Sequence, residues 1–146
     1  MFHLCRETPY RLLLIALALV LLFAQSAAAA PAPPLVVAAG DSSPASKAQA
    51  NYTCDGLDDQ VEVQAALAAL PDGGTVVLSS GRFNCSGSIA PPAGATLLGQ
   101  GPEATSLEFS RNGILNVSEE HVTLDGFHVT GSGYVNASTN TTLDLG

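Results

Sequence analysis

Three carboxylates lie close together just ahead of a helical pattern. Asp58, Asp59 and Glu62 precede a run rich in alanine and leucine. Such a group can bind a metal ion or act as an acid pair. Asp59 and Glu62 also have the spacing of a capping box, and negative charge in the first turn favours the positive end of the helix dipole. The sequence therefore predicts a helix cap at Asp58, Asp59 and Glu62, and no metal site.

Two further acids, Asp125 and Asp144, occupy the same place in a short repeat. Residues 96–99 read TLLG, residues 123–126 read TLDG, and residues 142–144 read TLD. If these repeats stack as neighbouring strands, the two carboxylates lie about 4.8 Å apart, close to the separation that paired acids have in hydrolases. Asp125 with Gly126 is also a strong turn signal, which is the preferred interpretation. Asp125 and Asp144 are the candidate catalytic residues.

Two histidines flank the first of these acids. His121 and His128 lie on either side of Asp125 in the sequence, so a metal site would need all three side chains on one face. Strand alternation puts His121 and Asp125 on one face and His128 on the other. We therefore expect two surface histidines.

Residues 1–30 have the pattern of an export signal. Arg6 and Arg11 give a positive start, residues 12–24 form an unbroken apolar run, and small residues that suit cleavage follow. An uncleaved membrane anchor is the alternative, but the run is shorter than the roughly 20 residues that span a bilayer. We predict a removed signal peptide and a secreted or cell-surface protein.

Cysteines and sequons fit that compartment. After residue 30 two cysteines remain, Cys54 and Cys85, and an even count in an oxidising compartment indicates a disulfide. The bridge would contribute about 3–4 kcal/mol; the alternative is two buried free thiols. N-x-[ST] sequons predict glycosylation at Asn51, Asn84, Asn116, Asn136 and Asn140.

The overall charge limits the partners. The chain has 146 residues, a net charge of −8 and five Lys+Arg, so it lacks a basic patch for nucleic acid. Trp is absent and aromatic residues make up 5%, which leaves little material for stacking against sugars.

The sequence predicts a linker, then a helix, then a series of short strands as the elements that position these residues. Residues 31–50 form a Pro/Ala linker, a short first strand at 35–39 and a polar loop at 41–50. A helix starts after Asp59, has its apolar face at Val63, Ala66, Leu67 and Leu70, and stops at Pro71. Short strands separated by turns follow from residue 75 onward, with Phe83 inward and Arg82 outward. The repeats predict stacked coils; a β-sandwich is the alternative.

These features have a counterpart in a known family. The sequences CDGLDDQVEVQAA at 54–66 and GGTVVL at 73–78, followed by Gly81 and Phe83, resemble the N-terminal segment of right-handed parallel β-helix proteins of the pectate-lyase-like superfamily. The likeness covers roughly residues 35–131 and is strongest to exported, surface-associated members. It implies a mainly β, right-handed single-stranded parallel β-helix (solenoid), with the helix covering its N-terminal end.

The resemblance says less about activity. Lyases of that superfamily have Asp-rich calcium sites and a basic residue, and hydrolases have paired Asp residues; neither pattern can be carried over here. We therefore expect a secreted or cell-surface module with a structural, adhesive or carbohydrate-binding role and no cofactor. Its expected partners are polysaccharide or cell-envelope components. The alternative is the N-terminal portion of a polysaccharide lyase or glycoside hydrolase, the lyase using calcium. Residues 51–146 are predicted to be the start of a β-helix domain that continues past residue 146.

Overall fold

A computed structural model describes residues 31–110, 112–132, 134–137 and 142–144. The predicted signal peptide, Met1–Ala30, and the sequon at Asn140 lie outside the described residues. Within the described part of the chain, neither helix has the length and apolar character needed to cross a membrane.

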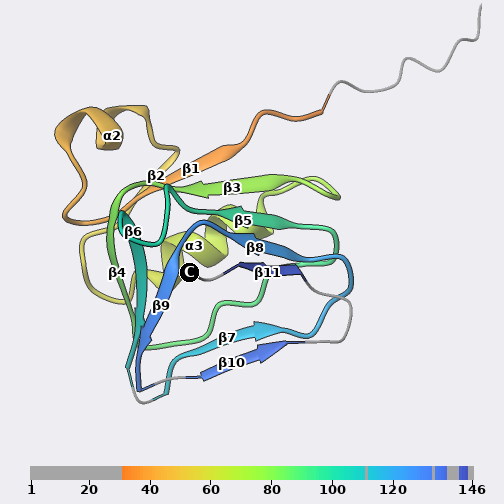
Figure 1. Ribbon diagram of the computed structural model, residues 1–146. Helices are drawn as coiled ribbons and strands as arrows, with labels where there is room; N and C mark the ends of the chain where they lie inside the picture. Colours follow the sequence, from red (N-terminus) through yellow and green to blue (C-terminus); the bar gives the residue numbers. More distant parts are fainter. Residues whose placement is uncertain (1–30, 111, 133, 138–141, 145–146) are drawn as a thin grey trace, which may run out of the picture. The chain divides into compact units, whose positions relative to one another are not determined.

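The described residues form short strands and two helices (Figure 1). The helices are α2 (Pro44–Gln49) and α3 (Gln60–Ala68). The strands are β1 (Leu35–Ala38), β2 (Tyr52–Thr53), β3 (Thr75–Leu78), β4 (Gly81–Cys85), β5 (Thr96–Leu98), β6 (Thr105–Phe109), β7 (Ile114–Val117), β8 (Thr123–Asp125), β9 (His128–Gly131), β10 (Tyr134–Ala137) and β11 (Thr142–Asp144).

The strands form three parallel sheets. Their orders are β11-β8-β5-β3-β1-β2, β4-β6-β9 and β10-β7, and every pairing among them is parallel. From β3 to β11, strands that follow one another in the chain lie in different sheets (Figure 1). Segments about one repeat apart in the sequence therefore become neighbours in space.

The repeat seen in the sequence is confirmed as a register. Thr96 pairs with Thr123, and Thr123 pairs with Thr142. Leu97 and Leu124, the second residues of the first two repeats, are fully buried because alternate side chains of a strand point to opposite faces. The other two sheets add buried residues from the same kind of alternation, including Phe83, Leu107 and Leu115. One hydrophobic core results, between the sheets.

The predicted fold class is wrong as stated. A right-handed single-stranded β-helix is not shown; the structure has separate short parallel sheets of six, three and two strands. Between β4 and β5 the chain makes only an isolated bridge at Ile89. Pro91 and Pro92 follow it and lack the N–H groups that a strand would donate. The parallel pairing also excludes the β-sandwich alternative for the described strands, because such sandwiches are antiparallel.

The helices differ from expectation at two places. One is the end of α3: it stops at Ala68, so Leu70, expected on its apolar face, follows the helix and is only partly buried. The predicted loop at 41–50 contains α2, because Ser43 caps it by accepting a hydrogen bond from the Ser46 N–H at 3.1 Å and Pro44 occupies its first turn. The predicted helix after Asp59 is confirmed as α3. It buries Val63, Ala66 and Leu67 and packs against β1, β2 and β4.

The corner after β5 requires glycine. A Cβ on Gly99 would lie 2.1 Å from the main-chain oxygen of Gly126 in the next repeat. We expect Gly99→Ala to lower the free energy of unfolding by about 2–3 kcal/mol, because rigid backbone must move to admit the methyl group. Urea unfolding measures this. The control is Gly87→Ala, whose added Cβ meets only the flexible Gln60 side chain at 3.1 Å and should cost under about 1 kcal/mol. Equal costs for both variants would refute the close approach.

Candidate functional site

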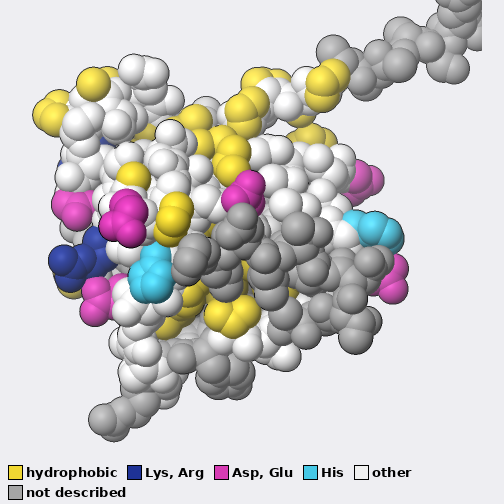
Figure 2. Space-filling model, viewed as in Figure 1, with side chains coloured by type: hydrophobic (Ala, Val, Ile, Leu, Met, Phe, Trp, Pro, Cys, Tyr) yellow, Lys and Arg dark blue, Asp and Glu magenta, His cyan; other side chains and the backbone are white. Residues whose placement is uncertain are grey.

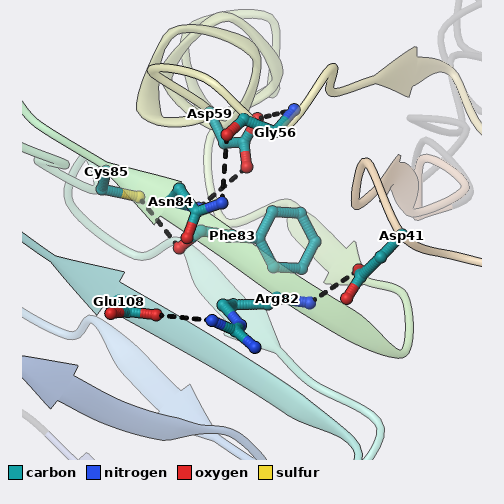
Figure 3. Close-up of polar contacts among 8 residues, drawn as sticks. All are labelled: Asp41, Gly56, Asp59, Arg82, Phe83, Asn84, Cys85 and Glu108. Atoms are coloured by element: carbon teal, nitrogen blue, oxygen red, sulfur yellow. Dashed lines mark hydrogen bonds and ion pairs between the residues drawn. The ribbon is translucent and has the colours of Figure 1, made fainter.

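Asp59 is a fully buried carboxylate at the start of α3 (Figure 3). Its Oδ1 accepts a hydrogen bond from the Gly56 N–H at 2.9 Å, and its Oδ2 accepts one from the Asn84 N–H at 2.8 Å. In return, the Asp59 N–H donates to the Asn84 carbonyl at 2.9 Å. Asp59 does stand immediately before the helix, as predicted, but its side chain makes no cap hydrogen bond. This corrects the capping box: the carboxylate instead joins the loop before α3, through Gly56, to β4, through Asn84.

Two glutamines of α3 also bind the segment that follows β4. Gln60 Oε1 accepts from the Ser86 N–H at 3.0 Å. Gln64 holds Ala90 by both backbone groups, accepting from its N–H at 2.8 Å and donating to its carbonyl at 3.2 Å. Residues Ser86 and Ala90 follow β4 in a segment that pairs with β7 only through the isolated bridge at Ile89. The glutamine side chains therefore supply the hydrogen bonds that a strand would otherwise make.

The outer face of the β4-β6-β9 sheet is polar. Its alternation turns Phe83 inward, fully buried, and leaves Arg82 exposed, as predicted. Arg82 donates to Glu108 Oε2 of β6 at 3.2 Å, and Figure 3 shows the two side chains meeting across adjacent strands. Their side chains are 60% and 44% exposed, so the pair contributes little to stability. In Figure 2 the Lys and Arg side chains of the visible face gather at one edge, next to acidic groups.

A pocket opens at the carboxyl ends of these three strands. It has a volume of about 340 Å³. Among the described residues, polar side chains from four segments line it: Asp58, Asn84, Ser86, Glu108, Ser110 and Ser132. The strand ends are held together, because Ser110 donates its N–H to the Cys85 carbonyl and Ser132 donates its N–H to the Phe109 carbonyl, both at 2.9 Å. The pocket is therefore formed on fixed backbone.

Asp58 enters this pocket from a left-handed backbone conformation, with φ of 55°. Asp is among the few residue types that tolerate this region. Its Oδ1 accepts a hydrogen bond from the Ser86 hydroxyl. Beside it, Asn84 donates its Nδ2 to the Gly56 carbonyl at 3.0 Å, which leaves the side-chain oxygen of Asn84 as an acceptor. Asp58 is thus a pocket residue and not the helix cap that the sequence suggested.

The two cysteines are free, buried thiols in the structure, which has no bridge between them. Both belong to the same core cluster. Burial, and then the negative charge of Asp59, raises the pKa of both thiols. The pKa of Cys85 rises to about 12, with Asp58 also contributing, and the pKa of Cys54 rises further, with Glu62 and Cys85 contributing. The disulfide stays a prediction that oxidation would test.

One group of side chains has metal-ligating atoms close together. Ligand atoms of Cys54, Asp59 and Glu62 all lie within 4.8 Å of one another. Glu62 Oε2 is buried and has no hydrogen-bond partner among the described residues. A thiolate with carboxylates is a donor set that zinc accepts, but both Asp59 oxygens already accept backbone hydrogen bonds. We assign no cofactor to this cluster.

The predicted catalytic acids are register partners on neighbouring strands. Asp125 of β8 pairs in register with Asp144 of β11, as the stacking hypothesis required. Asp125 is exposed at the end of its strand, and its other register neighbour is the apolar Leu98. Asp125 is not among the described residues that line the pocket. His121 precedes β8 and His128 begins β9, in another sheet; both are exposed.

The sequons fall in different environments. Asn51 is exposed, and its Oδ1 accepts from the Val36 N–H at 2.8 Å. Asn136 is exposed and donates to Asn116 Oδ1 at 2.9 Å. Asn84 is half-buried and lines the pocket. A glycan on Asn84 would therefore occupy the pocket, whereas one on Asn51 or Asn136 would project into solvent.

Sequence reasoning missed the pocket and the glutamines. The outward alternation of Arg82, Asn84 and Glu108 was visible in the strands, but their pairing depends on a register that joins residues far apart in the chain. The Gln60 and Gln64 spacing, one helical turn apart, was the available signal for a shared helix face.

Comparisons with known proteins were made at three levels. No family model matches the chain, and no curated protein or solved structure matches it. The likeness to the pectate-lyase-like superfamily therefore stays a prediction from the residues quoted above.

Proposed function

We propose that this chain is an exported carbohydrate-binding module, and that the pocket at the carboxyl ends of β4, β6 and β9 is its binding site. The observation that carries the proposal is the lining of this pocket. Carboxylate, amide and hydroxyl side chains converge there on a volume of about 340 Å³, which lies in the range of small-molecule sites. Sugars present many hydroxyl groups, and such side chains can both donate to and accept from them.

Two further features are compatible with a sugar ligand. Leu57, at the edge of the pocket, is 76% exposed and offers a small apolar surface to a sugar ring. The neighbouring outer face of the sheet carries Ser106, His128 and Thr130, paired in register with residues of the adjacent strand. An extended glycan leaving the pocket would meet hydrogen-bonding groups along this face. Export itself rests on the sequence of residues 1–30.

Asp58→Asn tests the site. The purified full chain is titrated calorimetrically with a panel of oligosaccharides. The variant is expected to weaken binding of the best ligand about tenfold, corresponding to about 1.4 kcal/mol, because an amide replaces a charged acceptor. Asn also tolerates a positive φ, so the fold should be preserved.

The matched control is Asp72→Asn, an exposed acid in the turn after α3 that does not line the pocket. It removes the same charge and should bind like the unmodified chain. Equal affinities for the two variants, or binding of no oligosaccharide at all, would count against the site.

A polysaccharide-active enzyme is the second candidate. The specific observation in its favour is that two carboxylates, Asp58 and Glu108, line one pocket, as glycoside hydrolysis requires. Incubation with neutral and acidic polysaccharides, with and without calcium, followed by assays for new reducing ends and unsaturated products, decides between them. Turnover that Asp58→Asn and Glu108→Gln both abolish would establish the enzyme.

A further inference from the structure

Two acids line the described part of the pocket, and we infer from them that its ligand is a chain of amino sugars with protonated amines, not a chain of uronic acids. This inference rests on the proposed sugar site and adds the ligand class. Two carboxylates, Asp58 and Glu108, line the pocket, and none of its described lining residues is Lys, Arg or His. The whole chain carries a net charge of −8, so the surrounding field also attracts cations.

A neutral group holds the Asp58 carboxylate in place. Its described partner is the Ser86 hydroxyl, and Asp58 forms no ion pair with another described residue. The left-handed backbone at Asp58 positions this side chain at a small conformational cost that the fold must offset. A protonated amine beside Asp58 would gain a charge-assisted hydrogen bond. A uronate carboxylate there would be repelled.

Glu108 is the second negative group, and Arg82 forms an ion pair with it. The ion pair joins Arg82 and Glu108 at 3.2 Å with both side chains substantially exposed, so solvent screens it and it opens easily. Glu108 lines the pocket whereas Arg82 does not. Arg82 is therefore a competitor for Glu108 that an incoming amine must displace. The neutral groups, Asn84, Ser110 and Ser132, remain for the hydroxyl groups of the ligand.

Three matched probes test the ligand class. The purified full chain is titrated at pH 6 and low salt with a glucosamine tetramer, an N-acetylglucosamine tetramer and a galacturonate tetramer. We expect the glucosamine tetramer to bind about tenfold more tightly than its acetylated form, and the galacturonate tetramer to bind most weakly. Raising the salt concentration should reduce the preference for the glucosamine tetramer over the other two probes, because exposed charges are screened.

Two variants of one ion pair should move affinity in opposite directions. Glu108→Gln removes a carboxylate and releases Arg82, so glucosamine binding should fall about tenfold and galacturonate binding should rise. Arg82→Gln releases Glu108, so glucosamine binding should strengthen a few-fold. Arg111 follows Ser110 in the sequence and lies outside the described residues; Arg111→Gln should keep the order of the three probes.

The outcomes separate the two proposals. Tightest binding of the galacturonate tetramer, or equal binding of all three, overturns the amino-sugar inference and leaves the sugar site standing. Binding of none of these probes and of no neutral oligosaccharide overturns the sugar site itself. Parallel, rather than opposite, responses of Glu108→Gln and Arg82→Gln also overturn the role assigned to the pair.

Discussion

Replacing Asp59 with alanine is expected to lower the free energy of unfolding by about 3 kcal/mol, since it leaves two partly buried backbone donors without their partner and a donor left unsatisfied costs about 1–3 kcal/mol. The carboxylate is fully buried and accepts from the backbone N–H groups of Gly56 and Asn84. Alanine leaves both donors without a partner and opens a small cavity. For a domain of this size the melting temperature should fall by roughly 10 °C or more. Urea and thermal unfolding measure the loss.

Two further variants test whether the lost hydrogen bonds of Asp59 cause the destabilisation. Asp59→Asn keeps the size and one acceptor oxygen but presents an NH₂ group to a backbone donor, so it should recover only part of the loss. Asp58→Asn changes the adjacent acid, whose described hydrogen bond is to the Ser86 hydroxyl, and should cost under about 1 kcal/mol. A small effect at Asp59, equal to that at Asp58, would show that both acids act as surface charges.

Raising the pH of the reduced protein above about 9 should destabilise it strongly. The thiols of Cys54 and Cys85 start from a reference pKa of 9.0, and the folded protein raises the pKa of Cys85 to about 12. Between these values the unfolded chain loses protons that the folded chain keeps, so stability falls as pH rises. The slope is about 1.4 kcal/mol per pH unit for each thiol. Urea unfolding at pH 8, 9, 10 and 11 measures it.

The oxidised protein should respond differently to high pH from the reduced protein. If Cys54 and Cys85 form the predicted disulfide, neither thiol remains to titrate. The alkaline loss should then shrink, and stability should rise by about 3–4 kcal/mol. Mass spectrometry after alkylation of the unfolded chain shows which form is present. A double Cys54→Ala, Cys85→Ala variant is the control for other groups that titrate at high pH. An identical pH slope in this variant and in the reduced protein would contradict the thiol account.

Local pattern was enough to place most elements. The alternation around Phe83, the helical spacing of Val63, Ala66 and Leu67, and the repeated Thr-Leu pairs each led to a buried position that the structure has. These signals succeed because the period of a single element sets which side chains face the core. In a strand alternate residues are buried, and in a helix every third to fourth residue is. The overall architecture was not local in this way: the predicted solenoid gives way to three sheets of unequal size.

Asp59 shows where local reasoning ends. Its position before α3 suits a cap, and only the packing of β4 beside the helix turns its carboxylate toward Asn84. Asp58 and Glu108 are far apart in the chain. They share a pocket because the Ser86 hydroxyl, just after β4, donates to Asp58 and because β4 pairs with β6, which carries Glu108. Thr105 is likewise fully buried and donates to the Ser79 carbonyl at 3.1 Å, although threonine is an ordinary surface residue.

The sequence alone determined the acidic charge, the pattern of an export signal, the position of α3 and the repeat that sets strand register. It determined them because each depends on composition, on residues within a few positions of one another, or on a motif that recurs along the chain. The tertiary structure alone decided which acids share a pocket, which one is buried, and that Gln60 and Gln64 complete the hydrogen bonding after β4. Those outcomes depend on backbone groups brought together from distant segments, whose unpaired donors must find partners wherever the fold places them.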